Sequence, residues 1–365
     1  MALSSAHSAL LYLLSCGAGC EPQGDMPELS SAEWQSLMDC SDRFGLSAVV
    51  LDGFRKVMPQ LPVDDALEYR MFQWFGESMR MEKKCSRMWD VAKTLDKWWG
   101  KEGIYAVVLK GRSIAQYYPD PQHRYSCDID VWIGEQWHHA CDILEQHNVE
   151  LCHEVYKEVE FTVDGTYVEC HRYITPVRGN KNLLQFERYL RILIDDSAQR
   201  KCFFADTTLQ NPPLMFTVML YVEHALGDLL HDAFSLKHIA DWMVLRRQDI
   251  MWSEFDERCK CFGFDRFVNL INALADFAEG RVAYSSLQGN HRQVLDSIFS
   301  KLDEQNGSKG NRDTGKSRPW LHDRIQLFFR ILSNARMFRE FGYCSMPNFL
   351  ISAVWAHFFD KEVKL

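Results

Sequence analysis

The stretch RYSCDIDVWI, from Arg124 to Ile133, places two aspartates one residue apart within an apolar run. Side chains alternate across a strand, so Asp128 and Asp130 project from one face while the residues between and after them enter the other. Two adjacent carboxylates resist joint ionisation unless a cation neutralises them, and hard oxygen ligands on one rigid strand suit Mg²⁺ or Mn²⁺. The stretch therefore predicts a strand that carries part of a metal site.

A third carboxylate would complete such a site, and Glu169 is the candidate. In the stretch TYVEC it lies mid-strand, with Val168 and Cys170 facing the opposite way. A strand beside that of Asp128 would bring Glu169 to the same metal ions. Two aspartates at this spacing are common by chance, and Glu169 alone is also compatible with a solvated position on an edge strand.

The segment before the two aspartates predicts a phosphate-binding turn. IYAVVLKG, over residues 104–111, is a β-rich apolar run that ends in glycine, and RSIAQYY after it starts a short helix. Backbone N–H groups at the helix start near Ser113 can hold a phosphate, and Gly111 allows its close approach. Lys110 and Arg112 add positive charge there, although each is also compatible with a solvated loop.

The pattern after the aspartates completes a small α/β unit. It predicts a helix over 135–147, followed by two alternating strands around Asp164 and Gly165. An Asp-Gly pair between such segments is a strong signal for a type I′ hairpin. We therefore expect residues 103–208 to form an α/β core with a mixed or antiparallel sheet.

Residues 1–102 predict an N-terminal helical domain. Leu10, Leu11 and Leu14 indicate a first amphipathic helix; the alternative is a lipoprotein signal, but no Lys or Arg precedes Leu10. Ser30 followed by Glu33 makes a capping box. From about residue 64 to residue 99, apolar positions recur three or four apart, which predicts one long helix.

Residues 209–365 predict a second helical domain. Asn211 and Pro212 are typical of a helix start before LMFTVMLYVEHAL, and the segments LKHIADWMVL and FDRFVNLINALADF have helical periodicity. The tract from Gln305 to Lys316 predicts a polar loop. The whole chain is thus expected to be α+β, with a small sheet flanked by N- and C-terminal helical domains.

Composition restricts the class of partner. The chain has 365 residues, 47% of them hydrophobic, and a formal net charge of −9, which disfavours a long nucleic acid as substrate. Its 12 cysteines are scattered and include no C-x-x-C pair, so reduced thiols in a cytoplasmic protein are expected rather than disulfides or structural zinc. No apolar run is long enough to span a bilayer.

A second phosphate-binding motif is predicted to be accidental. GNRDTGKS, from Gly310 to Ser317, matches the P-loop pattern at every fixed position. A P-loop requires a buried strand before it and a helix directly after it. The preceding KLDEQNGSK is polar, and Pro319 would interrupt a helix on the other side of the motif.

The composite VVLKGRSIAQYYPDPQHRYSCDIDVWI, over residues 107–133, resembles the uncharacterised nucleotidyltransferase family of the DNA polymerase β-like superfamily. Members carry Leu-Lys-Gly, then Tyr-Pro-x-Pro-x-x-Arg, then Asp-Ile-Asp. The order of the other segments is also similar to that family: helices precede the composite, and VECH and then LKHIADWMVL follow it. In the superfamily Gly or Ser follows the glycine of the phosphate helix, whereas here Arg112 follows Gly111 and the small hydroxyl residue is Ser113.

The resemblance implies a two-metal site and a reaction. Asp128, Asp130 and Glu169 would hold two Mg²⁺ or Mn²⁺ ions that clamp a nucleoside triphosphate, with Asp128 bridging both. An acceptor hydroxyl would then attack the α-phosphorus and expel pyrophosphate. Lys110, Gly111, Arg112 and Ser113 would contact the phosphates, and Lys237 in the C-terminal helices is a further candidate that is also compatible with a solvated helix face.

Three functions remain open on the sequence alone. The first is transfer of a nucleotide to a small molecule such as a sugar phosphate. The second is transfer to a protein or RNA end, and the third is non-catalytic binding. The three carboxylates favour catalysis over the third, and the acidic charge favours a small-molecule acceptor over RNA.

Overall fold

The computed structural model describes residues 3–58, 65–177, 181–195, 201–202, 207–307, 334–342 and 347. The chain divides into two compact units, each built from separate stretches of sequence. Unit 1 comprises Met1–Met79, His224–Gln248 and Phe264–Gly342; unit 2 comprises Arg80–Glu223, Asp249–Gly263 and Tyr343–Leu365. The P-loop-like octapeptide at 310–317 lies outside the described residues, so its interpretation stays a prediction.

Unit 1 is helical throughout its described part. Its helices are α1 (Ser5–Gly17), α2 (Ser31–Arg43), α3 (Ser47–Val57), the first part of α4 (Asp65–Lys101), the end of α8 (Leu214–Leu230), α9 (Leu236–Leu245), α11 (Asp265–Ala278), the short η3 (Tyr284–Ser286), α12 (Gly289–Gly307) and α14 (Ala335–Phe341). The predicted capping box of α2 is confirmed, because Glu33 Oε2 accepts from the Ser30 N–H at 2.8 Å.

The first predicted helix is confirmed as α1, but it is not amphipathic. Leu10, Leu13 and Leu14 are all fully buried, and so are residues on its other sides. A helix that is apolar on most sides belongs in a protein core. Across the described residues, no helix combines the length and the apolar character that crossing a membrane requires.

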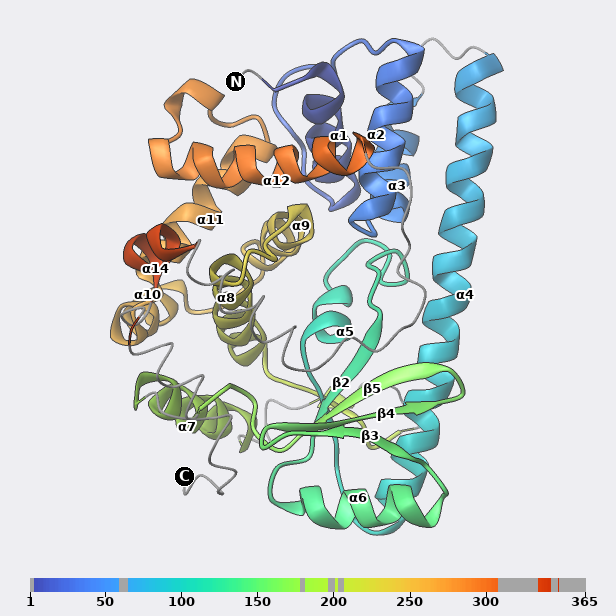
Figure 1. The fold of residues 1–365 in the computed structure, drawn as a ribbon, viewed down its shortest axis with the longest axis vertical. Coiled ribbons are helices and arrows are strands. Elements are labelled where there is room, and N and C mark those ends of the chain that lie inside the picture. Colours follow the sequence, from blue (N-terminus) through green and yellow to red (C-terminus); the bar gives the residue numbers. More distant parts are fainter. Residues whose placement is uncertain are drawn as a thin grey trace. The chain divides into compact units, whose positions relative to one another are not determined.

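Unit 2 contains a mixed sheet (Figure 1), which confirms the predicted α+β class. Among the described residues its seven strands run in the order β3-β4-β5-β2-β1-β7-β6. The β2–β5 and β1–β7 pairs are parallel and the others antiparallel. The strands are β1 (Val107–Val108), β2 (Asp128–Trp132), β3 (Leu151–Glu154), β4 (Glu158–Val163), β5 (Thr166–His171), β6 (Lys201–Cys202) and β7 (Gln210–Asn211).

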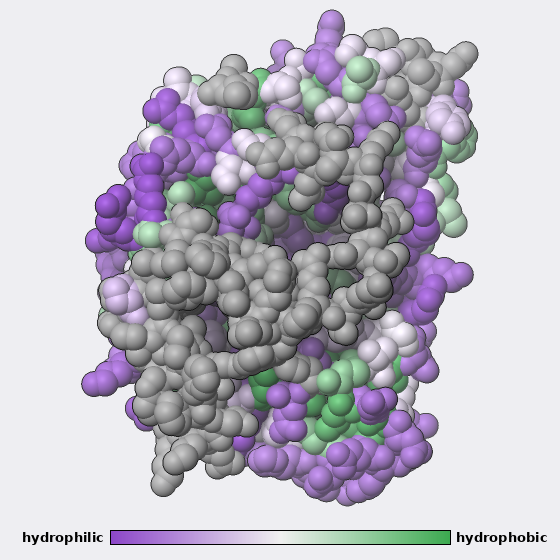
Figure 2. Space-filling view, in the orientation of Figure 1, coloured by the Kyte–Doolittle hydropathy of each residue, from purple (hydrophilic) through white to green (hydrophobic). Residues whose placement is uncertain are grey.

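Helices complete unit 2, and two of them, α4 and α6, cover one face of the sheet. The helices of unit 2 are the later part of α4, α5 (Lys110–Ala115), the short η2 (Gly134–Gln136), α6 (Trp137–Gln146), α7 (Lys181–Asp195), the first part of α8, and α10 (Trp252–Phe262). Side chains of α4 and α6 pack with alternate residues of β2, β4 and β5 in one core. The outer side of α6 is polar, as the purple band in Figure 2 shows. The opposite sheet face is therefore left for polar side chains.

The predicted hairpin is confirmed, whereas two other local predictions need correction. Asp164 and Gly165 join β4 to β5 with φ of 48° and 74°, as a type I′ turn requires. The strand predicted over 104–111 is only two residues long, because Lys110 already begins α5. Asn211 does not cap a helix: it belongs to β7, whose Gln210 N–H donates to the carbonyl oxygen of Ala106, and α8 begins at Leu214.

Candidate active site

The candidate site lies on the polar face of the sheet, where β2 and β5 run side by side. In this parallel pair Asp130 is opposite Glu169, and Asp128 is opposite Tyr167. Since side chains alternate, Asp128, Asp130 and Glu169 share one face, and the intervening residues enter the core. The expectation that Glu169 lies on a strand next to that of Asp128 is thus confirmed.

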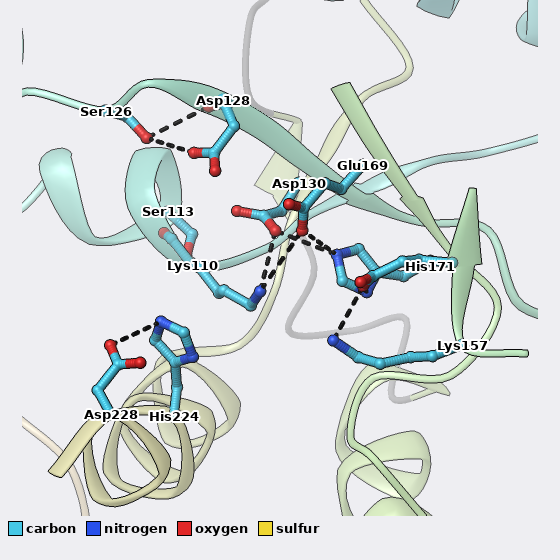
Figure 3. Close-up of polar contacts among 11 residues, drawn as sticks. Lys110, Ser113, Ser126, Asp128, Asp130, Lys157, Glu169, His171, His224 and Asp228 are labelled. Atoms are coloured by element: carbon cyan, nitrogen blue, oxygen red, sulfur yellow. Dashed lines mark hydrogen bonds and ion pairs between the residues drawn. The ribbon is translucent and has the colours of Figure 1, made fainter. Parts of the chain in front are cut away.

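Four side chains converge at the centre of this face (Figure 3). Potential ligand atoms of Asp130, Glu169 and His171 all lie within 4.8 Å of one another. His171 Nε2 is 3.1 Å from Asp130 Oδ1 and 3.5 Å from Glu169 Oε2. Lys110 Nζ is 3.0 Å from Asp130 Oδ1 and 4.0 Å from Glu169 Oε2. Two basic groups therefore face two carboxylates in one small space.

The other side of the imidazole is also held. His171 Nδ1 lies 2.9 Å from Glu158 Oε2, and that carboxylate lies 2.9 Å from Lys157 Nζ. The side chain of His171 is fully buried and that of Asp130 is 5% exposed, whereas that of Glu169 is 20% exposed. Glu169 is thus the carboxylate of this pair that is more open to a substrate.

Burial and charge act against each other on these groups. Burial disfavours the ionised form of Asp130, but the charge of Lys110 and the hydrogen bond with His171 hold its pKa well below the usual value. Burial likewise opposes the charged form of Lys110, yet Asp130 and Glu169 raise the pKa of this ammonium. For His171, burial and the charge of Lys157 lower the pKa, but its close contacts with Asp130, Glu158 and Glu169 raise it to about 9.

Glu169 responds in the opposite sense to Asp130. The hydrogen bond with His171 acts to lower its pKa, but burial and the nearby charge of Asp130 together raise it. The pKa of Glu158 is lowered, because the hydrogen bond with His171 and the charge of Lys157 outweigh burial. The two facing carboxylates of β2 and β5 therefore differ in proton affinity.

Asp128 lies on the same face but outside this convergent group. The hydroxyl of Ser126 donates to Asp128 Oδ1 at 3.2 Å (Figure 3). Gly111 packs against that hydroxyl so closely that a Cβ at position 111 would lie 2.4 Å from Ser126 Oγ. The glycine of the Lys110-Gly111 turn is therefore required here by contact with the loop that precedes Asp128.

The remaining predicted phosphate contacts are dispersed. Ser113 is buried, and its hydroxyl donates to the carbonyl oxygen of Lys110 at 2.8 Å. The Arg112 guanidinium lies over the Trp89 ring, on α4, at 4.4 Å from the ring centroid. Lys237 is a half-buried residue of α9 in unit 1. Nucleotide-binding roles for these three residues stay predictions.

Sequence reasoning missed His171 and Glu158. His171 follows Glu169 by two residues, so strand alternation alone would have placed it on the same face. Glu158 reaches the site only because β4 pairs with β5 in a register that sets Glu158 opposite His171. That register depends on the hairpin turn, which the sequence did indicate.

The convergent donor atoms suit a divalent cation. Carboxylate oxygens are preferred by Mg²⁺, Mn²⁺ accepts both carboxylate and imidazole, and the ligand atoms are close enough to share one ion. Lys110 supplies a positive charge at the same place, which suits an anionic substrate. The arrangement combines cation ligands with an anion-binding group, as phosphoryl-transfer chemistry requires.

The match to a family model agrees with this geometry. Residues 30–277 match the model of an uncharacterised nucleotidyltransferase family, and the chain belongs to that family. The matched range runs from α2 into the last turn of α11, and it includes every residue of the candidate site. Neither the curated proteins nor the solved structures include a match to this chain.

Proposed function

We propose that this protein transfers a nucleoside monophosphate from a nucleoside triphosphate to an acceptor hydroxyl and releases pyrophosphate. The observation that carries the proposal is the convergence of Asp130, Glu169 and His171 within 4.8 Å, with Lys110 Nζ 3.0 Å from Asp130. Membership of a nucleotidyltransferase family supports the class of reaction.

Asp130 and Glu169 are proposed to hold Mg²⁺ or Mn²⁺, and His171 becomes a third donor when the incoming ion displaces the proton from its Nε2. Asp128, two residues along the same strand face, is proposed to take part in holding a second ion. Bound ions of this kind neutralise phosphate charge and lower the pKa of an acceptor hydroxyl. The donor set fits because its atoms are already close, and because Glu169 retains an exposed fraction of 20%.

The protein's own side chains account for the rest of the proposed reaction. The acceptor oxygen forms a bond to the α-phosphorus, and the bond from the α-phosphorus to the bridging oxygen of the β-phosphate breaks, so pyrophosphate leaves. Glu169 Oε2 is proposed to accept the hydroxyl proton, because this carboxylate is more accessible than that of Asp130. Lys110 is proposed to leave Asp130 and bind the phosphates of the substrate.

A small molecule is the proposed acceptor. The net charge of −9 disfavours the binding of a long polyphosphate chain. Transfer to a protein or RNA end is the alternative. Labelling of the product separates the two, because macromolecular and small products migrate differently.

The test is transfer of label from each α-labelled nucleoside triphosphate, with Mg²⁺ or Mn²⁺ and a cell extract as the source of acceptors. Wild-type protein is expected to label a small molecule in a metal-dependent way, and Glu169→Gln is expected to reduce the rate at least about 100-fold. Asp164→Asn, in the exposed hairpin turn, is the control that removes a carboxylate elsewhere in unit 2. Equal labelling by Glu169→Gln and wild type would exclude the mechanism.

A further inference from the structure

A separate pocket lies between α4 and α5, within unit 2. It has a volume of about 390 Å³, in the range of small-molecule sites. Ser86 and Trp89 line it from α4, Arg112 and Gln116 from α5, and Pro121 and Gln122 from the following turn. Ser86, Pro121 and Gln122 are exposed, so the pocket opens to solvent, and none of its lining residues is acidic.

Arg112 is a buried cation at this pocket. It is only 3% exposed, and among the described residues its Nε has no hydrogen-bond partner. The guanidinium carbon lies 4.4 Å from the centroid of the Trp89 ring. The thiol of Cys85 contacts the guanidinium through a hydrogen bond, and it is a neutral group in its usual state. Within the described part of the chain, no carboxylate forms an ion pair with Arg112.

A buried guanidinium without a carboxylate partner destabilises the folded protein, unless the anion of a ligand supplies the missing charge. Burying a charged group without a counter-charge is unfavourable, and buried cations in proteins are normally paired with acids. Lys110, two residues earlier, shows the usual solution, because it pairs with Asp130 and Glu169. Arg112 contacts α4 instead, so its charge is neutralised neither by those carboxylates nor by a residue of the pocket.

We infer that this pocket binds a small molecule through a carboxylate or phosphate group held by Arg112. A guanidinium already fixed on an indole presents its N–H groups in a planar fork that matches either anion. The hydroxyl of Ser86 and the amide of Gln122 stand at the exposed rim, where they can bind polar parts of the same molecule. The site is distinct from the metal cluster and does not depend on the proposed nucleotidyl transfer.

Calorimetric titration of the full chain in metal-free buffer tests this inference. The probes are phenyl phosphate and benzoate, which separate the two anion classes, and benzyl alcohol, which has a similar ring and no charge. We expect at least one anion to bind, benzyl alcohol to bind at least tenfold more weakly, and Arg112→Gln to weaken the anion about tenfold or more. Arg87→Gln removes an exposed charge from α4, the helix that carries Trp89, and is expected to change affinity less than twofold.

A second variant tests the same pocket without changing the buried Arg112, in case Arg112→Gln fails to fold. Gln122→Trp adds an indole at the exposed rim, leaves Arg112 in place, and is expected to block the anion if the pocket is the site. The inference is overturned if neither anion binds more tightly than benzyl alcohol. It is also overturned if Gln122→Trp and a folded Arg112→Gln protein both bind the anion as wild type does.

Discussion

The contacts of Asp130 and Asp128 determine how much stability the protein loses when each aspartate is replaced. Asp130 is paired with Lys110 and with the buried imidazole of His171, whereas Asp128 is contacted by the neutral hydroxyl of Ser126. The sequence suggests that neighbouring carboxylates repel one another when no metal is bound. The structure shows that Lys110 and His171 lie against Asp130, so their attraction offsets that repulsion. Both groups would lose their counter-charge if Asp130 were replaced.

Asp130→Asn and Asp128→Asn are therefore expected to differ in stability. Removing one partner of a buried ion pair typically costs about 3–5 kcal/mol, because the other charge remains buried. Asp130→Asn should lower the free energy of unfolding by about this amount, and Asp128→Asn, whose amide oxygen still accepts from Ser126, should change it by less than about 1 kcal/mol. Urea unfolding followed by circular dichroism measures both. Equal losses in the two variants would contradict the ion-pair interpretation.

Gly111 offers a second prediction at this scale. A Cβ at this position would meet Ser126 Oγ at 2.4 Å and Ser126 Cβ at 3.2 Å. Gly111→Ala should therefore displace the loop that holds Asp128 and destabilise the protein by about 1–3 kcal/mol. Adding Ser126→Ala removes the closest atom, so the double variant should recover part of that loss, which a double-mutant cycle of unfolding free energies would show. A strictly additive double variant would argue against this contact.

Elements with strong local signals could be predicted from the sequence. The capping box of α2, the length of α4 and the turn between β4 and β5 follow from residue types at fixed spacings. Alternation also predicted that Asp128, Asp130 and Glu169 share a face. The features that could not be predicted depend on pairing between distant strands: the short β1, the strand character of Gln210 and the approach of Glu158 to His171.

The β4–β5 turn links local backbone preference to the site. Gly165 has φ of 74°, and no atom lies within 4 Å of the point that a Cβ would occupy, so Gly165→Ala introduces backbone strain without a clash. The expected cost is about 1 kcal/mol, since a left-handed conformation is unfavourable for alanine. Gly227→Ala, in the interior of α8 and equally unobstructed, should instead stabilise the protein by up to about 1 kcal/mol. Thermal unfolding of both variants tests the contrast. If both substitutions raised the melting temperature, or both lowered it, the prediction would be wrong.

At the scale of the whole molecule, the net charge of −9 is a sum over the chain, and the charges around the candidate site balance differently. Around Asp130, three acids (Asp130, Glu158 and Glu169) are neutralised by Lys110, Lys157 and His171. The cluster is therefore close to neutral without any ion, and a divalent cation must compete with Lys110 for Asp130. This competition predicts that metal alone binds more weakly than metal together with a nucleoside triphosphate, because the phosphates provide another partner for Lys110.

Thermal stabilisation by Mn²⁺ tests the metal site separately from catalysis. A ligand that binds only the folded protein stabilises it by about 2.7 kcal/mol at 100 times its dissociation constant. We expect Mn²⁺ with a non-hydrolysable nucleoside triphosphate to raise the melting temperature of wild type and of Asp164→Asn, and to raise that of Glu169→Gln much less, because Glu169 is one of three converging donors. An increase in Glu169→Gln as large as that in wild type would place the ion elsewhere and leave the cluster with a structural role.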